Sequence, residues 1–160
     1  MRRVATIGVY GFTLDTFVAA LREAGVGVLL DVRQRRGVRG HEYAWANARR
    51  LQEELAEARV AYRHLKQLAP TTAMREAQYR EDERHGIGKR NRMQLASAFR
   101  DAYLREVLDR VDLAPIVAEL PDDAVGALMC VERDPEACHR SLIAARIAAE
   151  HDVTVTHLRP

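Results

Sequence analysis

The sequence has few of the features that place a chain in a special class. Only two of its 160 residues are cysteines, Cys130 and Cys138, which is too few for a disulfide framework. Its longest apolar runs, at 26–30 and 125–131, are far shorter than the roughly 20 residues that a membrane-spanning helix needs. The apolar stretch after Met1 is interrupted by glycines and has no small-residue cleavage site, so no signal peptide is predicted. We therefore expect a cytoplasmic protein with free thiols and no membrane association.

Lysine is almost absent as well. Lys66 and Lys89 are the only two, so the remaining 23 of the 25 basic residues are arginines. Arginine suits bidentate recognition of phosphate and carboxylate, although a GC-rich genome explains the same bias. The net charge of +2 is low for a protein whose main task is to grip duplex nucleic acid. The 48% apolar and 30% charged residues are typical of a globular domain and exclude a disordered chain.

Several signature motifs are missing too. The sequence has no P-loop, no GxGxxG fingerprint and no GxSxG nucleophile elbow. Internal repeats and linkers are also absent, so we expect one domain over residues 1–160.

The N-terminal third predicts a strand–helix–strand unit. Apolar runs at 4–9 and 26–32 are typical of buried strands. The segment between them has the spacing of an amphipathic helix, with Leu14, Phe17 and Leu21 on one face. The short connections predict that the two strands are parallel.

The C-terminal third predicts a second unit of this kind. A buried strand is expected at 124–131 and an alternating strand at 153–158. Between them, Asp134 followed by Pro135 is a strong helix start, and the helix is expected to end near residue 150.

The middle of the chain predicts mostly helices. We expect helices at 44–58, 93–111 and 113–120, a short strand at 61–65, and a short helix with a mobile loop in the polar segment 70–92. The fold class is therefore α/β: a three-layer, open, mainly parallel sheet flanked by helices.

Unusual residues follow three of the predicted strands. Because the carboxyl ends of parallel strands lie at one edge of a sheet, where such folds bind ligands, we expect these residues to form one site. We assign Asp31, Glu132, Cys138 and His139 to catalysis, and Gly8, Tyr10, Arg33 and Arg140 to substrate binding.

Cys138 is the most informative of these residues. In the first turn of a helix that starts at Asp134, it would lie near free N–H groups and the positive helix end, which bind anions and favour a thiolate. Arg140 would clamp a phosphate or carboxylate. The alternative is that Cys138 is a small buried apolar residue.

Other residues have structural interpretations of their own. Cys130 lies within an apolar strand and is expected in the core. His157 is expected to be a core or edge histidine, and Asp31 or Arg33 has the alternative role of a structural ion-pair member. A metal site could be assembled from Cys130, Cys138, His139 and His157, but their spacing matches no closed zinc pattern, so we predict no metal. The sequence leaves open whether a cofactor is bound.

Two basic segments offer a different site. Residues 33–39 and 84–92 combine arginines with glycine, as loops that contact phosphates do. In a nucleic-acid-associated protein the binding residues would be Arg35, Arg36, Arg39, Lys89 and Arg90. A solvated charged surface explains the same residues.

Four strings of residues resemble a known family. They are Thr6-Ile7-Gly8, Asp31-Val32-Arg33, Cys130-Val131-Glu132 and Cys138-His139-Arg140. Together they resemble the domain of unknown function 488 family over nearly the whole chain. The resemblance implies a small, intracellular, stand-alone α/β protein with a site formed by the residues assigned above. The chain departs from the family where Gln34-Arg35-Arg36 follows the Asp-x-Arg string, a position that often holds proline. The similarity of Asp31-Val32-Arg33 to rhodanese-like domains is weaker, since neither cysteine has the loop position of a rhodanese nucleophile.

Three functions are compatible with these residues. The favoured one is an enzyme acting on a small anionic or nucleotide-like substrate, held by Arg33 and Arg140. The second is a nucleic-acid-associated module that uses the basic segments. In the third, Glu132 and Arg140 only pair with each other and fix the last helix to the sheet.

Overall fold

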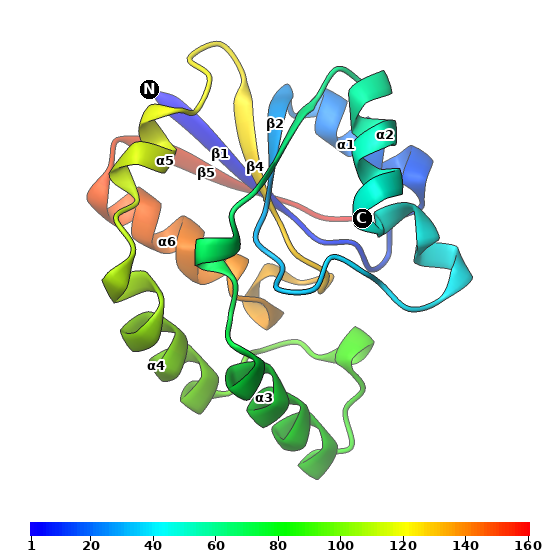
Figure 1. Ribbon diagram of the computed structural model, residues 1–160, viewed down its shortest axis with the longest axis vertical. Coiled ribbons are helices and arrows are strands. Elements are labelled where there is room, and N and C mark those ends of the chain that lie inside the picture. Colours follow the sequence, from blue (N-terminus) through cyan, green and yellow to red (C-terminus); the bar gives the residue numbers. More distant parts are fainter.

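The computed structural model describes residues 1–160 as a five-stranded sheet between two layers of helices (Figure 1). The strands are β1 (Arg2–Ile7), β2 (Val26–Asp31), β3 (Ala61–His64), β4 (Val125–Met129) and β5 (Val153–Leu158). They lie in the order β3-β2-β4-β1-β5, and every neighbouring pair is parallel. The predicted three-layer α/β fold is confirmed, and the sheet is parallel throughout.

Six α-helices and five short 3₁₀ turns connect the strands. The α-helices are α1 (Leu14–Glu23), α2 (Ala48–Glu57), α3 (Thr72–Arg84), α4 (Ser97–Glu106), α5 (Ala114–Ala118) and α6 (Arg140–Glu150). The 3₁₀ turns are η1 (His41–Ala46), η2 (Lys66–Leu68), η3 (Lys89–Asn91), η4 (Leu108–Arg110) and η5 (Pro135–Ala137). No helix is both long and apolar enough to cross a membrane.

The two faces of the sheet carry separate cores. Alternate side chains of β1, β2 and β4 pack against α1, η1 and α2 on one face, where Phe17 and Trp45 are central. The side chains that point to the other face of these strands pack against α4, α5 and α6. Tyr103 and Ile143 are among the fully buried residues of this second core. Figure 1 shows these groups of helices on opposite sides of the strands.

The order of the strands creates a switch point next to β4. From β1 the chain crosses to β2 on one side, whereas from β4 it crosses to β5 on the other, although β1 and β4 are neighbours. Because the two connections leave in opposite directions, they diverge outside the carboxyl ends of β1 and β4. Open α/β sheets bind their ligands in the crevice at such a point.

Three predicted helices differ from those observed. The helix expected at 44–58 is divided at Asn47, which is extended and accepts a hydrogen bond from the Val38 N–H with its side chain at 2.8 Å. The polar segment 70–92 contains the longest helix, α3, rather than a short one. The helix expected from Asp134 begins at Arg140, because η5 and an extended Cys138 come first.

Candidate functional site

The carboxyl ends of β2 and β4 open into a narrow cleft of about 50 Å³ that α3 and η3 close from the other side. Sixteen residues line it: Arg33, Gln34, Arg35, Pro70, Arg75, Gln78, Tyr79, Lys89, Arg92, Leu95, Phe99, Cys130, Val131, Glu132, Cys138 and His139. Of the eight residues assigned to the site from sequence, Arg33, Glu132, Cys138 and His139 lie on this lining.

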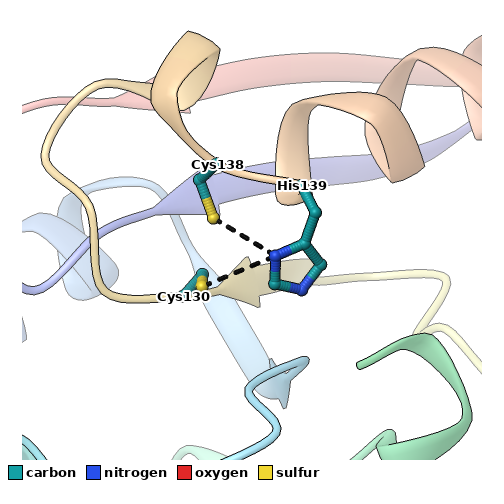
Figure 2. A group of neighbouring side chains, drawn as sticks. All are labelled: Cys130, Cys138 and His139. Carbon is teal, nitrogen blue, oxygen red and sulfur yellow. Dashed lines mark hydrogen bonds between the residues drawn. The ribbon is translucent and has the colours of Figure 1, made fainter. Parts of the chain in front are cut away.

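Two thiols and an imidazole meet at one point of the lining (Figure 2). Nδ1 of His139 lies 3.8 Å from Sγ of Cys130 and 3.6 Å from Sγ of Cys138. All three residues are buried. Cys130 comes directly after β4, and its alternation with Leu128 directs its side chain to the α6 face of the sheet. Cys138 and His139 reach the same point because they lie in the break between η5 and α6.

The hydrogen bonds of His139 determine which ring nitrogen carries a proton. Nε2 lies 2.8 Å from the carbonyl oxygen of Val32. A carbonyl only accepts, so Nε2 must hold the hydrogen and donate it. Nδ1 therefore presents its lone pair, or a second proton, to the two sulfurs.

The two thiols titrate in opposite directions. Burial raises the pKa of Cys130 well above its ordinary value, and the neighbouring Cys138 raises it further. Burial also opposes ionisation of Cys138, but the hydrogen bond from Cys130 and the charge of His139 outweigh it and hold the pKa of Cys138 well below normal. Burial lowers the pKa of His139, yet the adjacent Cys138 raises it more. Of the two, Cys138 is therefore the thiol that ionises first.

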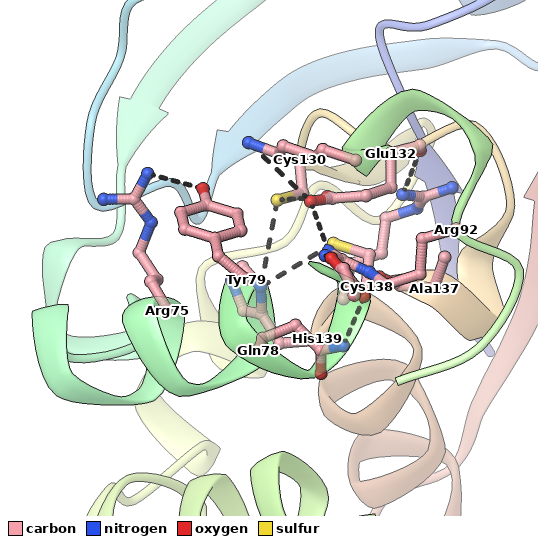
Figure 3. A network of polar contacts seen from close by, with 12 residues as sticks. Arg75, Gln78, Tyr79, Arg92, Cys130, Glu132, Ala137, Cys138 and His139 are labelled. Carbon is pink, nitrogen blue, oxygen red and sulfur yellow. Dashed lines mark hydrogen bonds and ion pairs between the residues drawn. The ribbon is translucent and has the colours of Figure 1, made fainter. Parts of the chain in front are cut away.

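A buried ion network joins this group to α3 (Figure 3). Arg92 donates to Asp82 at 2.6 Å and to Glu132 at 2.8 Å, and its Nε donates to the Ala137 carbonyl at 3.2 Å. The other oxygen of Glu132 accepts from the Cys130 thiol at 3.4 Å. One guanidinium therefore fixes the α3 helix, the Glu132 carboxylate and the loop before Cys138 relative to one another.

The mouth of the cleft carries an excess of positive charge. Five lining residues are basic and only Glu132 is acidic. Arg33 and Arg92 are also paired with Asp31 and Asp82, which lie just outside the lining. The sum of five positive and three negative charges leaves +2.

Three cations account for this excess. Arg35 and Arg75 form no ion pair, while Lys89 lies 3.9 Å from Glu132. Arg75 donates to Gln34 at 2.8 Å and to the Tyr79 hydroxyl at 3.0 Å, and it lies over the Tyr79 ring. Burial lowers the pKa of Lys89, but Glu132 together with Tyr79, Cys130 and Tyr10 raises it more, so the pKa is raised and the amine stays charged.

Asp31 and Arg33 form a structural pair. Arg33 donates to both carboxylate oxygens of Asp31, at 2.9 and 2.8 Å, and to the Ala46 carbonyl at 2.8 Å. The Tyr62 hydroxyl donates to Asp31 at 2.6 Å. Both charged residues are fully buried, so this pair forms part of the cleft wall, and the Asp31 carboxylate lies outside the lining.

The remaining predicted substrate-binding residues, Gly8, Tyr10 and Arg140, lie outside the lining. Arg140 donates to the main-chain carbonyls of Glu132 at 2.6 Å and Arg133 at 3.0 Å, so its partner is the Glu132 backbone rather than the carboxylate. Gly8 lies against that same carbonyl, and Tyr10 packs against Tyr43 with the two rings tilted at 56°.

The two basic segments meet, but most of their charges are already engaged. Arg90 pairs with Glu42 at 2.8 Å and donates to the Arg39 carbonyl, and it lies over the Tyr10 ring. Arg36 donates to Tyr62 at 3.3 Å. Of the five residues assigned to nucleic-acid binding, only Arg35 and Lys89 line the cleft.

Sequence reasoning missed the residues that α3 and the segment after it contribute. Arg75, Gln78 and Arg92 line the cleft, and Asp82 lies behind them. One signal was available: Met74, Gln78 and Asp82 recur every four residues, and all three are buried on one face of α3. A search for apolar spacing alone overlooks such a face.

Comparison with known proteins supports the resemblance noted in the sequence. A family model described as "Domain of unknown function DUF488" matches residues 13–147. No curated protein and no solved structure matches the chain. The matched segment includes the cleft-lining residues and most of the sheet, and the chain belongs to the DUF488 family.

Proposed function

We propose that this protein is an enzyme that binds a small anionic substrate in the cleft between β4 and α3. The observation that carries the proposal is the combination of a mouth with two unpaired guanidiniums and a base that holds thiols, an imidazole and a carboxylate. Uncompensated arginines attract and orient phosphate or carboxylate groups. Clefts that combine them with several convergent titratable groups are characteristic of active sites.

The charged and titratable residues in and around the cleft have separate roles in this proposal. Arg35 and Arg75, with Lys89, hold the anionic group. Glu132, the one carboxylate of the lining, accepts a proton during the reaction, and Cys138 and His139 lie buried beside it at the base of the cleft. Asp31 acts indirectly, because Arg33 and Tyr62 occupy both of its oxygens. Arg140 positions Glu132 through the main chain.

Calorimetric titration with inorganic phosphate, pyrophosphate and simple phosphate or carboxylate esters tests the binding step. Arg75→Gln removes one unpaired cation, and we expect it to weaken binding about 10-fold to 100-fold, as loss of a charge-assisted hydrogen bond does. Arg80→Gln on the same helix removes an exposed arginine outside the cleft, and it should bind like the wild type. Equal affinity for Arg75→Gln and wild type would contradict the proposal.

The nucleic-acid alternative has a distinct signature in the same experiment. Binding of an oligonucleotide that falls steeply with salt, is weakened by Arg39→Gln and is unaffected by Arg75→Gln would assign the function to the basic loops. A catalytic role for Glu132 predicts that Glu132→Gln still binds phosphate but no longer turns over any ester that the wild type accepts.

A further inference from the structure

We propose that Cys130, Cys138 and His139 form a binding site for a divalent transition metal, with zinc the best match. The three residues offer three ligand atoms that all lie within 4.8 Å of one another. Thiolate and imidazole are the ligands that zinc prefers, and two cysteines with one histidine occur in catalytic zinc sites that keep a fourth position open.

The distances fit an ion of this size. Zinc binds sulfur at about 2.3 Å and nitrogen at about 2.0–2.1 Å, so tetrahedral angles separate a sulfur and a nitrogen ligand by about 3.6 Å. The observed separations from Nδ1 of His139 are 3.6 Å to Cys138 and 3.8 Å to Cys130. An ion placed among these atoms needs little movement of the side chains (Figure 2).

The groups behind the ligands support the same interpretation. A histidine that binds a metal usually donates its other ring N–H to a carbonyl or carboxylate, and Nε2 of His139 donates to the Val32 carbonyl. This bond fixes the tautomer that leaves Nδ1 free to bind a metal. The Cys130 sulfur also contacts Glu132, whose other oxygen is held by Arg92.

Charge and burial favour a metal over a free nucleophile. Two thiolates and a neutral imidazole carry a charge of −2, which a divalent ion cancels, and buried charge is costly unless it is compensated in this way. Cys138 exposes only 1% of its surface, which leaves an attacking substrate little access to its sulfur. A metal ligand needs no such access.

The fourth coordination position would open toward the cleft, because all three ligands and Glu132 belong to its lining. The ligands come from two places in the chain, the end of β4 and the break before α6, and only folding brings them together. Their spacing in the sequence therefore matches no closed zinc motif. The metal site does not depend on the anion-binding function proposed above, because it needs neither Arg35 nor Arg75.

Cobalt substitution tests the site in the full-length, untagged protein. The chain is freed of metal by a chelator, dialysed and titrated with Co²⁺, which gives intense visible bands when tetrahedral and a near-ultraviolet band when bound by thiolate. We expect both bands to saturate at an equimolar amount of Co²⁺ and to disappear when Zn²⁺ is added. Cys138→Ser and Cys130→Ser should lose the thiolate band in part, and His139→Gln should shift the visible bands.

His85→Asn is the matched control, because it removes an exposed histidine at the end of α3, and it should titrate like the wild type. If a ligand variant fails to fold, the wild-type spectrum alone still reports thiolate and tetrahedral coordination. A wild-type spectrum that stays that of aqueous Co²⁺, or one that is unchanged in Cys138→Ser, would overturn the proposal. Phosphate titration of the same samples separates this result from failure of the anion site, since that binding is read by Arg75→Gln.

Discussion

At the scale of single residues, the site depends on the close approach of two main-chain segments. Gly8 follows β1 and lies against the Glu132 carbonyl, where a side chain would overlap that oxygen. Arg140 donates to the same carbonyl, and its side chain is fully buried. The two residues together fix the main chain from which the Glu132 carboxylate extends into the cleft.

Gly8→Ala tests this close approach. We expect it to lower the free energy of unfolding by about 3 kcal/mol, because the new methyl group must displace the Glu132 backbone in a packed interior. Gly88→Ala is the matched control, since the nearest atom to its new methyl group is 3.9 Å away and its φ of −76° suits any residue. Urea unfolding measures both variants. If Gly8→Ala loses no more unfolding free energy than the control, the close contact between Gly8 and the Glu132 carbonyl does not matter for stability.

The stability that the Tyr62 hydroxyl contributes should depend on pH. Burial raises the pKa of its hydroxyl, which donates to Asp31 at 2.6 Å. A folded pKa above the unfolded value of about 10 means that the unfolded chain loses this proton first, so the stabilisation is complete below pH 10 and declines as pH rises further.

Tyr62→Phe should therefore destabilise the protein by about 1.5 kcal/mol at pH 8, the net value of a hydrogen bond to a charged group, and by less at pH 11. Chemical denaturation at the two pH values gives the difference. A loss of unfolding free energy in Tyr62→Phe that stays constant or grows between pH 8 and pH 11 would contradict this account.

At the scale of elements, α3 is held to the sheet mainly through polar groups. Its buried face consists of Met74, Gln78 and Asp82, and Arg92 connects Asp82 to Glu132 at the end of β4. Removal of one partner from such a buried network leaves an uncompensated charge, whereas an exposed pair contributes little.

A double-mutant cycle between Asp82 and Arg92 measures this connection. We expect Arg92→Ala to cost about 3–5 kcal/mol, and the cycle to give a coupling energy of about 2 kcal/mol. The exposed pair Glu81 and Arg84, on the same helix at 3.1 Å, is the control, and its coupling should stay within about 0.5 kcal/mol. Equal coupling in the two cycles would mean that α3 is not held by this network.

The elements also show which features the sequence can predict. The strands β1, β2 and β4 were predicted closely, since an unbroken apolar run is the direct consequence of burial between two helical layers. The strand β5 was predicted from its alternation, which suits a half-exposed strand at the edge of the sheet. The helix α3 was underestimated because its buried face is polar. The start of α6 was placed too early, because Asp134 and Pro135 begin a 3₁₀ turn that ends before Cys138.

The same reasoning explains the outcome for the site. The sequence was sufficient to assign Glu132, Cys138 and His139, because all three come soon after the end of β4. These residues do lie together in the cleft lining. Arg75 and Arg92 could not, since they come from a segment with no apolar period. The roles of Asp31 and Arg140 depend on partners that only the fold supplies, a tyrosine from β3 and two main-chain carbonyls.

At the scale of the whole molecule, the fold brings two different chemistries to one cleft. The sheet presents Cys130 and Glu132 at the switch point between β1 and β4, and the break between η5 and α6 supplies Cys138 and His139. The α3 segment covers this group and adds the cations at the mouth. The two proposals together give a buried site for a divalent ion beneath an opening that attracts anions.

The most direct test of this account is the crystal structure of the full-length protein grown with zinc and inorganic phosphate, with diffraction data collected on both sides of the zinc absorption edge. We expect an anomalous peak between the Cys130 sulfur, the Cys138 sulfur and Nδ1 of His139, and phosphate density within hydrogen-bonding distance of Arg75. A cleft without phosphate and a Cys130–Cys138–His139 group without an anomalous peak, in crystals soaked to saturation, would contradict the account.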